Sequence, residues 1–133
     1  MKKRLKKWNK PKFDRRGLTQ WNWMCQYYQK LKLGKYVDIG AFCYLNAKFG
    51  IELGDFVQIG SHCALYSVST VDNKKGRIIF KENVRLGTHS TVMPGVTIGK
   101  NSIIGAFSFV NKDVPDNVLA FGVPVKIIRK IEL

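Results

Sequence analysis

An aliphatic residue recurs every six positions along most of this sequence, and this spacing restricts the fold more than any other feature. Six matches neither the period of about 3.6 of a helix nor the period of 2 of a strand. Twelve six-residue units can be counted from residue 33 onward, and each begins with a bulky apolar residue. These first positions are Leu33, Ile39, Leu45, Leu53, Ile59, Leu65, Phe80, Leu86, Val92, Ile98, Ile104 and Val110. Such a repeat predicts a solenoid in which each coil covers the next.

The other positions of the unit indicate how the coil turns. The fifth position is small in eleven of the twelve units, which leaves room inside the coil for the bulky first position. Glycine tends to fill the second position of two successive units and to be absent from the third, so eighteen residues form one turn. We therefore predict an all-β fold: a three-sided parallel β-helix of about four coils, stacked at the strand spacing of about 4.8 Å.

Breaks in the repeat divide the chain into four parts. We expect a basic tail over 1–16, a short amphipathic helix over 17–32 that caps the first coil, and the β-helix over 33–115. Residues 116–133 form a C-terminal extension that ends in a short strand or helix. Two extra residues, Ile51 and Glu52, follow the first coil, and nine, 71–79, follow the second. We expect the nine-residue insertion to be a functional surface loop.

Charge and cysteine content limit the setting of the protein. The net charge is +14, and residues 1–16 carry nine basic side chains against one acid. A solvated tail is the simplest interpretation; contact with an anionic membrane surface is an alternative, and nucleic-acid binding is a less favoured one. No apolar run reaches the roughly 20 residues of a membrane span, and we see no signal peptide. Three cysteines, an odd number without metal-ligand spacing, favour a reducing cytoplasmic setting.

The hexads and the closing stretch PGVTIGKNSIIGAFSFVNKDVPDNVLAFGVPVKIIRKI resemble the hexapeptide-repeat acyltransferases, above all the sugar O- and N-acetyltransferases. The resemblance covers about residues 33–130. It implies a left-handed coil, a homotrimer, and acetyl-CoA bound as co-substrate in a groove between adjacent subunits. It favours as acceptor a nucleotide-linked (amino) sugar or a precursor of a surface polysaccharide; the alternative is a free or polymer-linked sugar that is O-acetylated with a histidine base.

Several positions of the resemblance carry expected roles in binding CoA. The stretch IGAFSFVNKD matches the part of the family that contacts the pantetheine and phosphates, and GVPVKIIR matches the part near the 3′-phosphate. The backbone amide of the threonine in LGTHST is expected to face the thioester, where an oxyanion develops. The expected CoA-binding residues are Thr88, Ala106, Asn111, Lys112, Lys126 and Arg129.

The candidate catalytic residues are the two histidines. His62 and His89 are fourth residues of the middle units of their coils, so we expect them to stack on one edge about one strand spacing apart. Either can serve as a base for a hydroxyl acceptor, with His89 slightly favoured because it follows Thr88. Both can equally be surface histidines without chemistry.

The loop before the third coil departs from the family, because many sugar O-acetyltransferases carry their catalytic histidine there and STVDNKKGRII has none. Asp72 and Asn73 are its candidates for orienting the acceptor. An amino sugar is nucleophilic without a base, so O- and N-acetylation both remain open. A scaffold protein without catalysis is a third possibility. No metal is expected, since two histidines do not match the zinc hydrases built on this coil.

Overall fold

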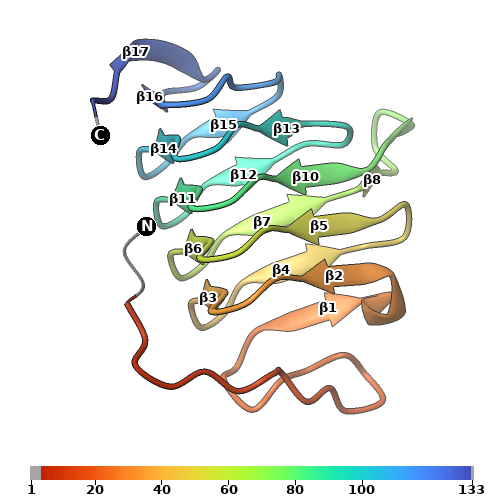
Figure 1. Ribbon diagram of the computed structural model, residues 1–133. Helices are drawn as coiled ribbons and strands as arrows, with labels where there is room; N and C mark the ends of the chain where they lie inside the picture. Colours follow the sequence, from red (N-terminus) through yellow and green to blue (C-terminus); the bar gives the residue numbers. More distant parts are fainter. Residues whose placement is uncertain (1–3, 133) are drawn as a thin grey trace.

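The structure is a computed structural model, and it describes residues 4–132. The chain winds into a stack of three-sided coils whose short parallel strands line three faces (Figure 1). The first face contains β2 (Leu31–Leu33), β5 (Ile51–Leu53), β10 (Ile78–Phe80) and β13 (Thr97–Ile98). The second contains β3 (Asp38–Ile39), β6 (Gln58–Ile59), β11 (Arg85–Leu86) and β14 (Ile103–Ile104). The third contains β4 (Tyr44–Asn46), β7 (Ala64–Tyr66), β12 (Thr91–Val92) and β15 (Phe109–Val110).

The register of the strands confirms the six-residue pattern. On the third face, for example, Leu45, Leu65, Val92 and Val110 lie side by side on successive strands, and all four are fully buried. The other two faces align their first positions in the same way. In the interior, residues from the same position of the six-residue unit therefore form ladders across successive coils. The bulky residues of neighbouring coils pack directly on one another. The predicted all-β coil is confirmed, with additions at both ends that bring it to about five turns.

The helix that we predicted over residues 17–32 is not formed. The segment instead contains β1 (Met24–Gln26), which pairs in parallel with β4, and only a single 3₁₀ turn, η1 (Tyr28–Lys30). Cys25 lies beside Leu45 and extends its ladder by one step. The first coil offers unpaired backbone groups, and a strand satisfies them while a helix would not. Pairing with the first coil therefore decides the local structure of this segment, although the spacing of its apolar residues is typical of a helix.

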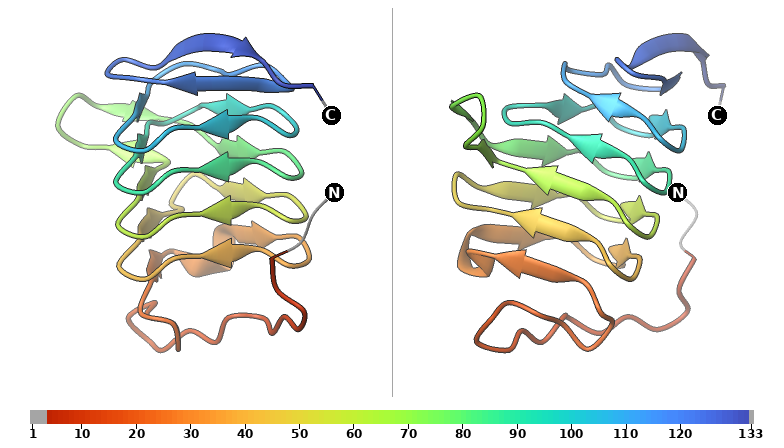
Figure 2. Two further views of the ribbon diagram at one scale, coloured as in Figure 1. Left: turned by 90° about the vertical axis from the view of Figure 1, so that its left-hand side faces the viewer. Right: turned by 180° about the vertical axis from the view of Figure 1, so that it is seen from behind.

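The basic N-terminal segment, predicted to be a solvated tail, is packed against the first coil from residue 4 onward (Figure 2). Trp8 donates its indole N–H to the carbonyl oxygen of Val37 at 2.8 Å, and Arg4 pairs with Asp38. The ring of Phe13 stacks on Tyr28 at 4.6 Å between ring centroids. Lys2 and Lys3, which contribute to the predicted tail, lie outside the described residues.

The insertion after the second coil is a β-hairpin, and its limits differ from those predicted. β8 (Val68–Ser69) and β9 (Lys74–Lys75) pair antiparallel and project from one corner of the coil (Figure 1). Ile78 and Ile79, assigned to the loop from the sequence, belong to β10, where they pair with Ile51 and Glu52 of β5. Ile51 with Glu52, and Ile78 with Ile79, fall outside the six-residue repeat in the sequence. In the structure all four belong to strands and lengthen the first face.

The C-terminal extension covers the other end of the coil. β16 (Val118–Phe121) continues the second face beside β14, and β17 (Lys126–Lys130) pairs antiparallel with it. Of the two alternatives, strand or helix, the chain therefore adopts the strand. All five residues of β17 are exposed.

Candidate functional site

Four rings stack at the corner between the second and third faces. We call them the ring column: Phe42, His62, His89 and Phe107. The imidazoles of His62 and His89 are nearly parallel, 4.7 Å between centroids, and the phenyl ring of Phe107 lies 4.9 Å above His89. The stacking that the hexad register predicts is therefore present. All four rings are exposed to solvent in the single chain.

The backbone explains why the ring column forms at this corner. All four residues have left-handed backbone angles, with φ between 59° and 65°. Such angles are uncommon for residues other than glycine. Each residue follows a glycine and a small residue, so the chain turns sharply and directs the fourth side chain outward. Repetition of this turn in successive coils brings the four rings into one line.

Hydroxyl groups below the ring column fix the orientation of His89. The Oγ1 of Thr88 lies 2.7 Å from the carbonyl oxygen of Ser61, which can only accept, so the single hydroxyl proton of Thr88 is directed there. The Nδ1 of His89, 2.9 Å from the same Oγ1, must then be the donor. In the neutral ring this leaves a lone pair on the other nitrogen, Nε2. A neutral His89 held in this way can accept a proton.

His62 is held less strictly. Its Nδ1 lies 3.0 Å from the Oγ of Ser61, and that hydroxyl is also 3.3 Å from the Oγ1 of Thr88. The Ser61 proton can be directed to either neighbour, so the hydrogen bonds allow both tautomers of His62. Sequence reasoning missed Ser61; the signal was present in the repeated motifs GSH and GTH, which place a hydroxyl before each histidine.

Glycines beneath this corner allow the backbones of neighbouring coils to approach closely. A Cβ on Gly60 would lie 2.7 Å from the amide nitrogen of Thr88, and one on Gly87 would lie 2.5 Å from that of Ala106. Among the backbone hydrogen bonds of residues 4–132, none uses the N–H of Thr88. The backbone N–H of the residue before His89 is therefore not used by a carbonyl of a neighbouring coil within the described residues.

The predicted CoA-binding residues fall into two groups. Thr88 and Ala106 lie on adjacent coils at the corner of the ring column, and Lys126 lies near them, opposite Phe121 at the end of β16. Arg129 pairs with Leu119, further along the second face. Asn111 and Lys112 lie instead at the far end of β15, at the next corner. Asn111, Lys112, Lys126 and Arg129 are all exposed.

The hairpin places Asp72 and Asn73 at its tip, at the corner between the third face and the next first face. A hydrogen bond from Ser69 and the charge of Lys74, whose Nζ lies 3.6 Å away, lower the pKa of Asp72. Val68 follows His62 by six positions, a strand path of roughly 20 Å. A single chain therefore does not bring the hairpin and the ring column together.

The cysteines are structural. Cys25, Cys43 and Cys63 are all buried, unpaired and part of the interior. Burial raises the pKa of Cys25 to about 12, so its reactive thiolate form is scarce at neutral pH. Within residues 4–132, no group of three or more histidine, cysteine or acidic side chains is placed to hold a metal ion.

Comparison with known proteins finds similarity to transferases with hexapeptide repeats. Residues 78–112 match the family model described as bacterial transferase hexapeptide (six repeats). A galactoside O-acetyltransferase of Lactococcus lactis subsp. lactis (strain IL1403) is 59% identical over 59 residues, which cover 44% of this chain and 28% of that protein. The chain thus matches little more than a quarter of the length of this relative. No helix within residues 4–132 is long and apolar enough to cross a membrane.

Two solved structures are similar to this chain over more than four fifths of its length. A galactoside acetyltransferase in complex with coenzyme A is 30% identical, with a TM-score of 0.74 over 83% of this chain and 59% of that one. A maltose O-acetyltransferase from Clostridium difficile 630 is also 30% identical, with a TM-score of 0.73 over 84% of this chain and 65% of that one. The similarity therefore extends well beyond the residues matched by the family model.

Proposed function

Because this chain belongs to the hexapeptide-repeat family, we propose that it transfers an acetyl group from acetyl-CoA to a hydroxyl group of a sugar. The similarity to a galactoside and a maltose O-acetyltransferase supports a sugar acceptor and an ester product. The observation that carries the proposal is the hydrogen-bonded His89, whose Nε2 keeps its lone pair, together with the N–H of the preceding Thr88, which bonds to no backbone carbonyl among residues 4–132. A base and an oxyanion donor are the two groups that acyl transfer to a hydroxyl requires.

The reaction then proceeds by direct attack. The Nε2 of His89 accepts the hydroxyl proton while the sugar oxygen forms a bond to the thioester carbonyl carbon. The carbonyl oxygen becomes an oxyanion, which the N–H of Thr88 stabilises. When the oxyanion collapses, the carbon–sulfur bond breaks, and the CoA thiolate takes the proton back from His89. Acetyl-ester and CoA thiol are the products, and His89 returns to its neutral form.

Binding of CoA is assigned in this proposal to the end of the coil that holds β14 to β17. Ala106 lies beside Thr88 without a bulky side chain, which leaves space for the pantetheine arm. Lys126 and Arg129 supply positive charge for the 3′-phosphate, and Asn111 and Lys112 supply contacts from the next corner. The exposure of these four side chains favours binding in an open groove rather than in a closed pocket.

We further propose that the protein acts as a homotrimer. The hairpin tip and the ring column lie at different corners of one chain, so a single chain cannot use both on one acceptor. In a ring of three copies, the hairpin of one subunit can approach the ring column of the next, which makes three equivalent sites. Sedimentation that shows a fully active monomer would exclude this arrangement.

Because acetyl-CoA and reduced thiols are both typical of the cytoplasm, we also propose that the protein is cytoplasmic.

A nucleotide-linked amino sugar is the second candidate acceptor. The ammonium groups of Lys48 and Lys75 lie 5.8 and 5.6 Å from the ring centroid of Phe49, beside the hairpin. Neither lysine forms an ion pair within residues 4–132. These charges suit a diphosphate, and an amine attacks a thioester without help from His89.

The test is a transfer assay with acetyl-CoA and a set of acceptors: galactosides, glucosides, amino sugars and nucleotide-linked amino sugars. Release of the CoA thiol gives the rate, and treatment of the product with alkaline hydroxylamine distinguishes an ester, which is cleaved, from an amide, which is not. We expect a cleavable product on a galactoside or glucoside. An amide as the only product would favour the second candidate. Binding of neither CoA nor any sugar would leave a scaffold role.

A further inference from the structure

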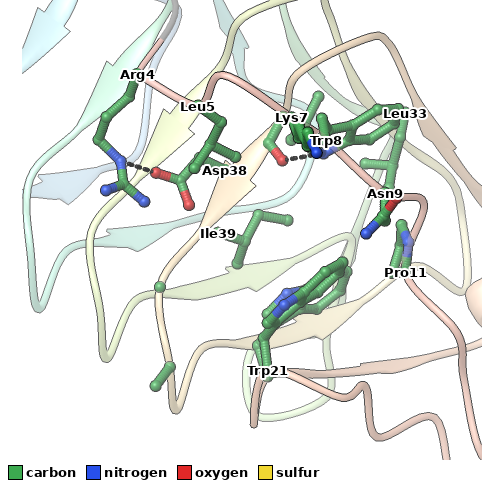
Figure 3. Close-up of a pocket in the computed structure, with 14 residues that line it drawn as sticks. Arg4, Leu5, Lys7, Trp8, Asn9, Pro11, Trp21, Leu33, Asp38 and Ile39 are labelled. Carbon is green, nitrogen blue, oxygen red and sulfur yellow. Dashed lines mark hydrogen bonds and ion pairs between the residues drawn. The ribbon is translucent and has the colours of Figure 1, made fainter.

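A pocket of about 370 Å³ lies between the N-terminal segment and the first coil, outside the hexad repeat (Figure 3). Its volume falls within the roughly 300–1,000 Å³ of small-molecule sites. Residues 4–11 form one side, and β3, the first strand of the second face, forms another together with the residues next to it, so Ile39 lines the pocket. Nothing in the reaction proposed above uses this pocket.

The walls combine indole rings with polar groups. Trp8, Trp21 and Trp23 contribute the aromatic surface. Trp8 is fixed by its hydrogen bond to Val37, and Trp23 is almost completely buried. Trp21, in contrast, is 40% exposed to solvent. The polar lining consists of Arg4, Lys7, Asn9 and Asp38. An aromatic wall with one exposed indole and several polar groups is typical of a small-molecule binding site.

The chemistry of the walls selects among possible ligands. One face of a pyranose ring carries C–H groups that pack against an indole, while its hydroxyl groups need hydrogen-bond partners around the edge. The pocket offers both. A hydrocarbon chain would make no use of the polar groups, and a phosphate would make no use of the indoles. A neutral sugar ring therefore fits the walls better than either.

The pocket is continuous with the corner of the ring column. Gly40 and Ala41 line it and directly precede Phe42, whose ring lies 5.2 Å from that of His62. Ala41 and Thr88 occupy the same position two coils apart, a separation of about 10 Å along the stack at the strand spacing. A ligand beside Ala41 is therefore about 10 Å along the stack from Thr88, which corresponds to the distance from one sugar unit to the next but one in an oligosaccharide.

We propose that this pocket binds a further sugar ring of the acceptor, the next but one from the reacting ring, so that the preferred substrate is an oligosaccharide rather than a monosaccharide. This inference rests on the proposed function in one respect, namely that the reacting sugar lies at the ring column. The N-terminal segment thus extends the acceptor site beyond the repeat, and the exposed ring of Trp21 selects the length of the substrate.

The activity test compares a monosaccharide with the corresponding di- and trisaccharides. For the wild type, kcat/KM should rise by about tenfold from the mono- to the trisaccharide, the factor expected for one well-stacked ring. In Trp21→Ala this rise should disappear while the rate with the monosaccharide stays unchanged, and Trp21→Phe should retain part of it. Leu18→Ala is the matched control, because Leu18 is equally exposed, at 42%, on the same segment but does not line the pocket.

A binding measurement separates this inference from the proposed function. Titration of the trisaccharide without acetyl-CoA, followed by calorimetry and tryptophan fluorescence, should show binding that Trp21→Ala weakens about tenfold and Leu18→Ala does not. Binding without any acetyl transfer would overturn the proposed function and support the sugar pocket. Transfer to monosaccharide and trisaccharide at equal rates, with equal binding in the wild type and Trp21→Ala, would overturn the sugar pocket alone.

Discussion

Replacement of Thr88 by valine tests whether a hydroxyl group beneath the ring column positions the base. Valine has the same shape but lacks Oγ1, and with it the contact at 2.9 Å to the Nδ1 of His89. The contact at 2.7 Å to the carbonyl oxygen of Ser61 is also lost, but that oxygen still accepts the backbone N–H of His89 at 3.1 Å. No buried acceptor is left without a partner, so the fold should lose about 1 kcal/mol or less.

The effect on catalysis should exceed the effect on stability. Loss of one orienting hydrogen bond of about 1 kcal/mol, together with free choice of tautomer, should lower kcat about 5- to 20-fold. The KM for acetyl-CoA should change little, because the backbone N–H of Thr88 remains. Thr88→Ser keeps the hydroxyl group and should restore most of the rate. The assay is CoA-thiol release at saturating acceptor, and a wild-type kcat in Thr88→Val would refute the assigned positioning role.

Three further predictions concern CoA, the hairpin and the thiols. Replacing Lys126 and Arg129 together by alanine should weaken CoA binding modestly, by about 1 kcal/mol or less per exposed ion pair, and should flatten its salt dependence in calorimetry; unchanged binding and salt dependence would remove both from the site. The double variant Asp72→Ala, Asn73→Gly keeps a residue that accepts the φ of 57° at the hairpin tip, so it should raise the KM for the acceptor while CoA affinity and Tm stay constant. A fall in Tm would instead mark the tip as structural. Because burial raises the pKa of Cys25 to about 12, this thiol should resist alkylation at pH 8 and react only on unfolding or near pH 12, as mass spectrometry can show. Rapid alkylation of Cys25 in the folded protein would contradict its burial.

The hexad repeat determined most of what could be predicted about the fold. A period of six with small fifth positions defines which side chains enter the interior, and the ladder of Leu45, Leu65, Val92 and Val110 shows the predicted register. The same register placed His62 and His89 in one column. These successes share a cause: in a solenoid, position in the repeat and position in space are related by a simple rule.

The segments outside the repeat could not be predicted in this way. The apolar residues of 17–32 have helical spacing, but Cys25 follows the strand pattern because β4 offers an open edge. The packing of Trp8 and its neighbours depends on contacts distant in the sequence, which charge content does not indicate. Ile78 and Ile79 were misplaced for a further reason: the first face uses three-residue strands, and the six-residue template does not show their extra length.

The most direct test of the account is the turnover of His89→Phe with acetyl-CoA and the sugar acceptor. Phe42 and Phe107 already occupy the same left-handed corner, so phenylalanine at position 89 should preserve both the turn and the stacking while removing the base. We expect kcat to fall roughly 10²- to 10⁴-fold with little change in CoA affinity, whereas the matched variant His62→Phe should cost less than about tenfold. A His89→Phe protein with near-wild-type turnover would contradict the proposal that His89 is the base.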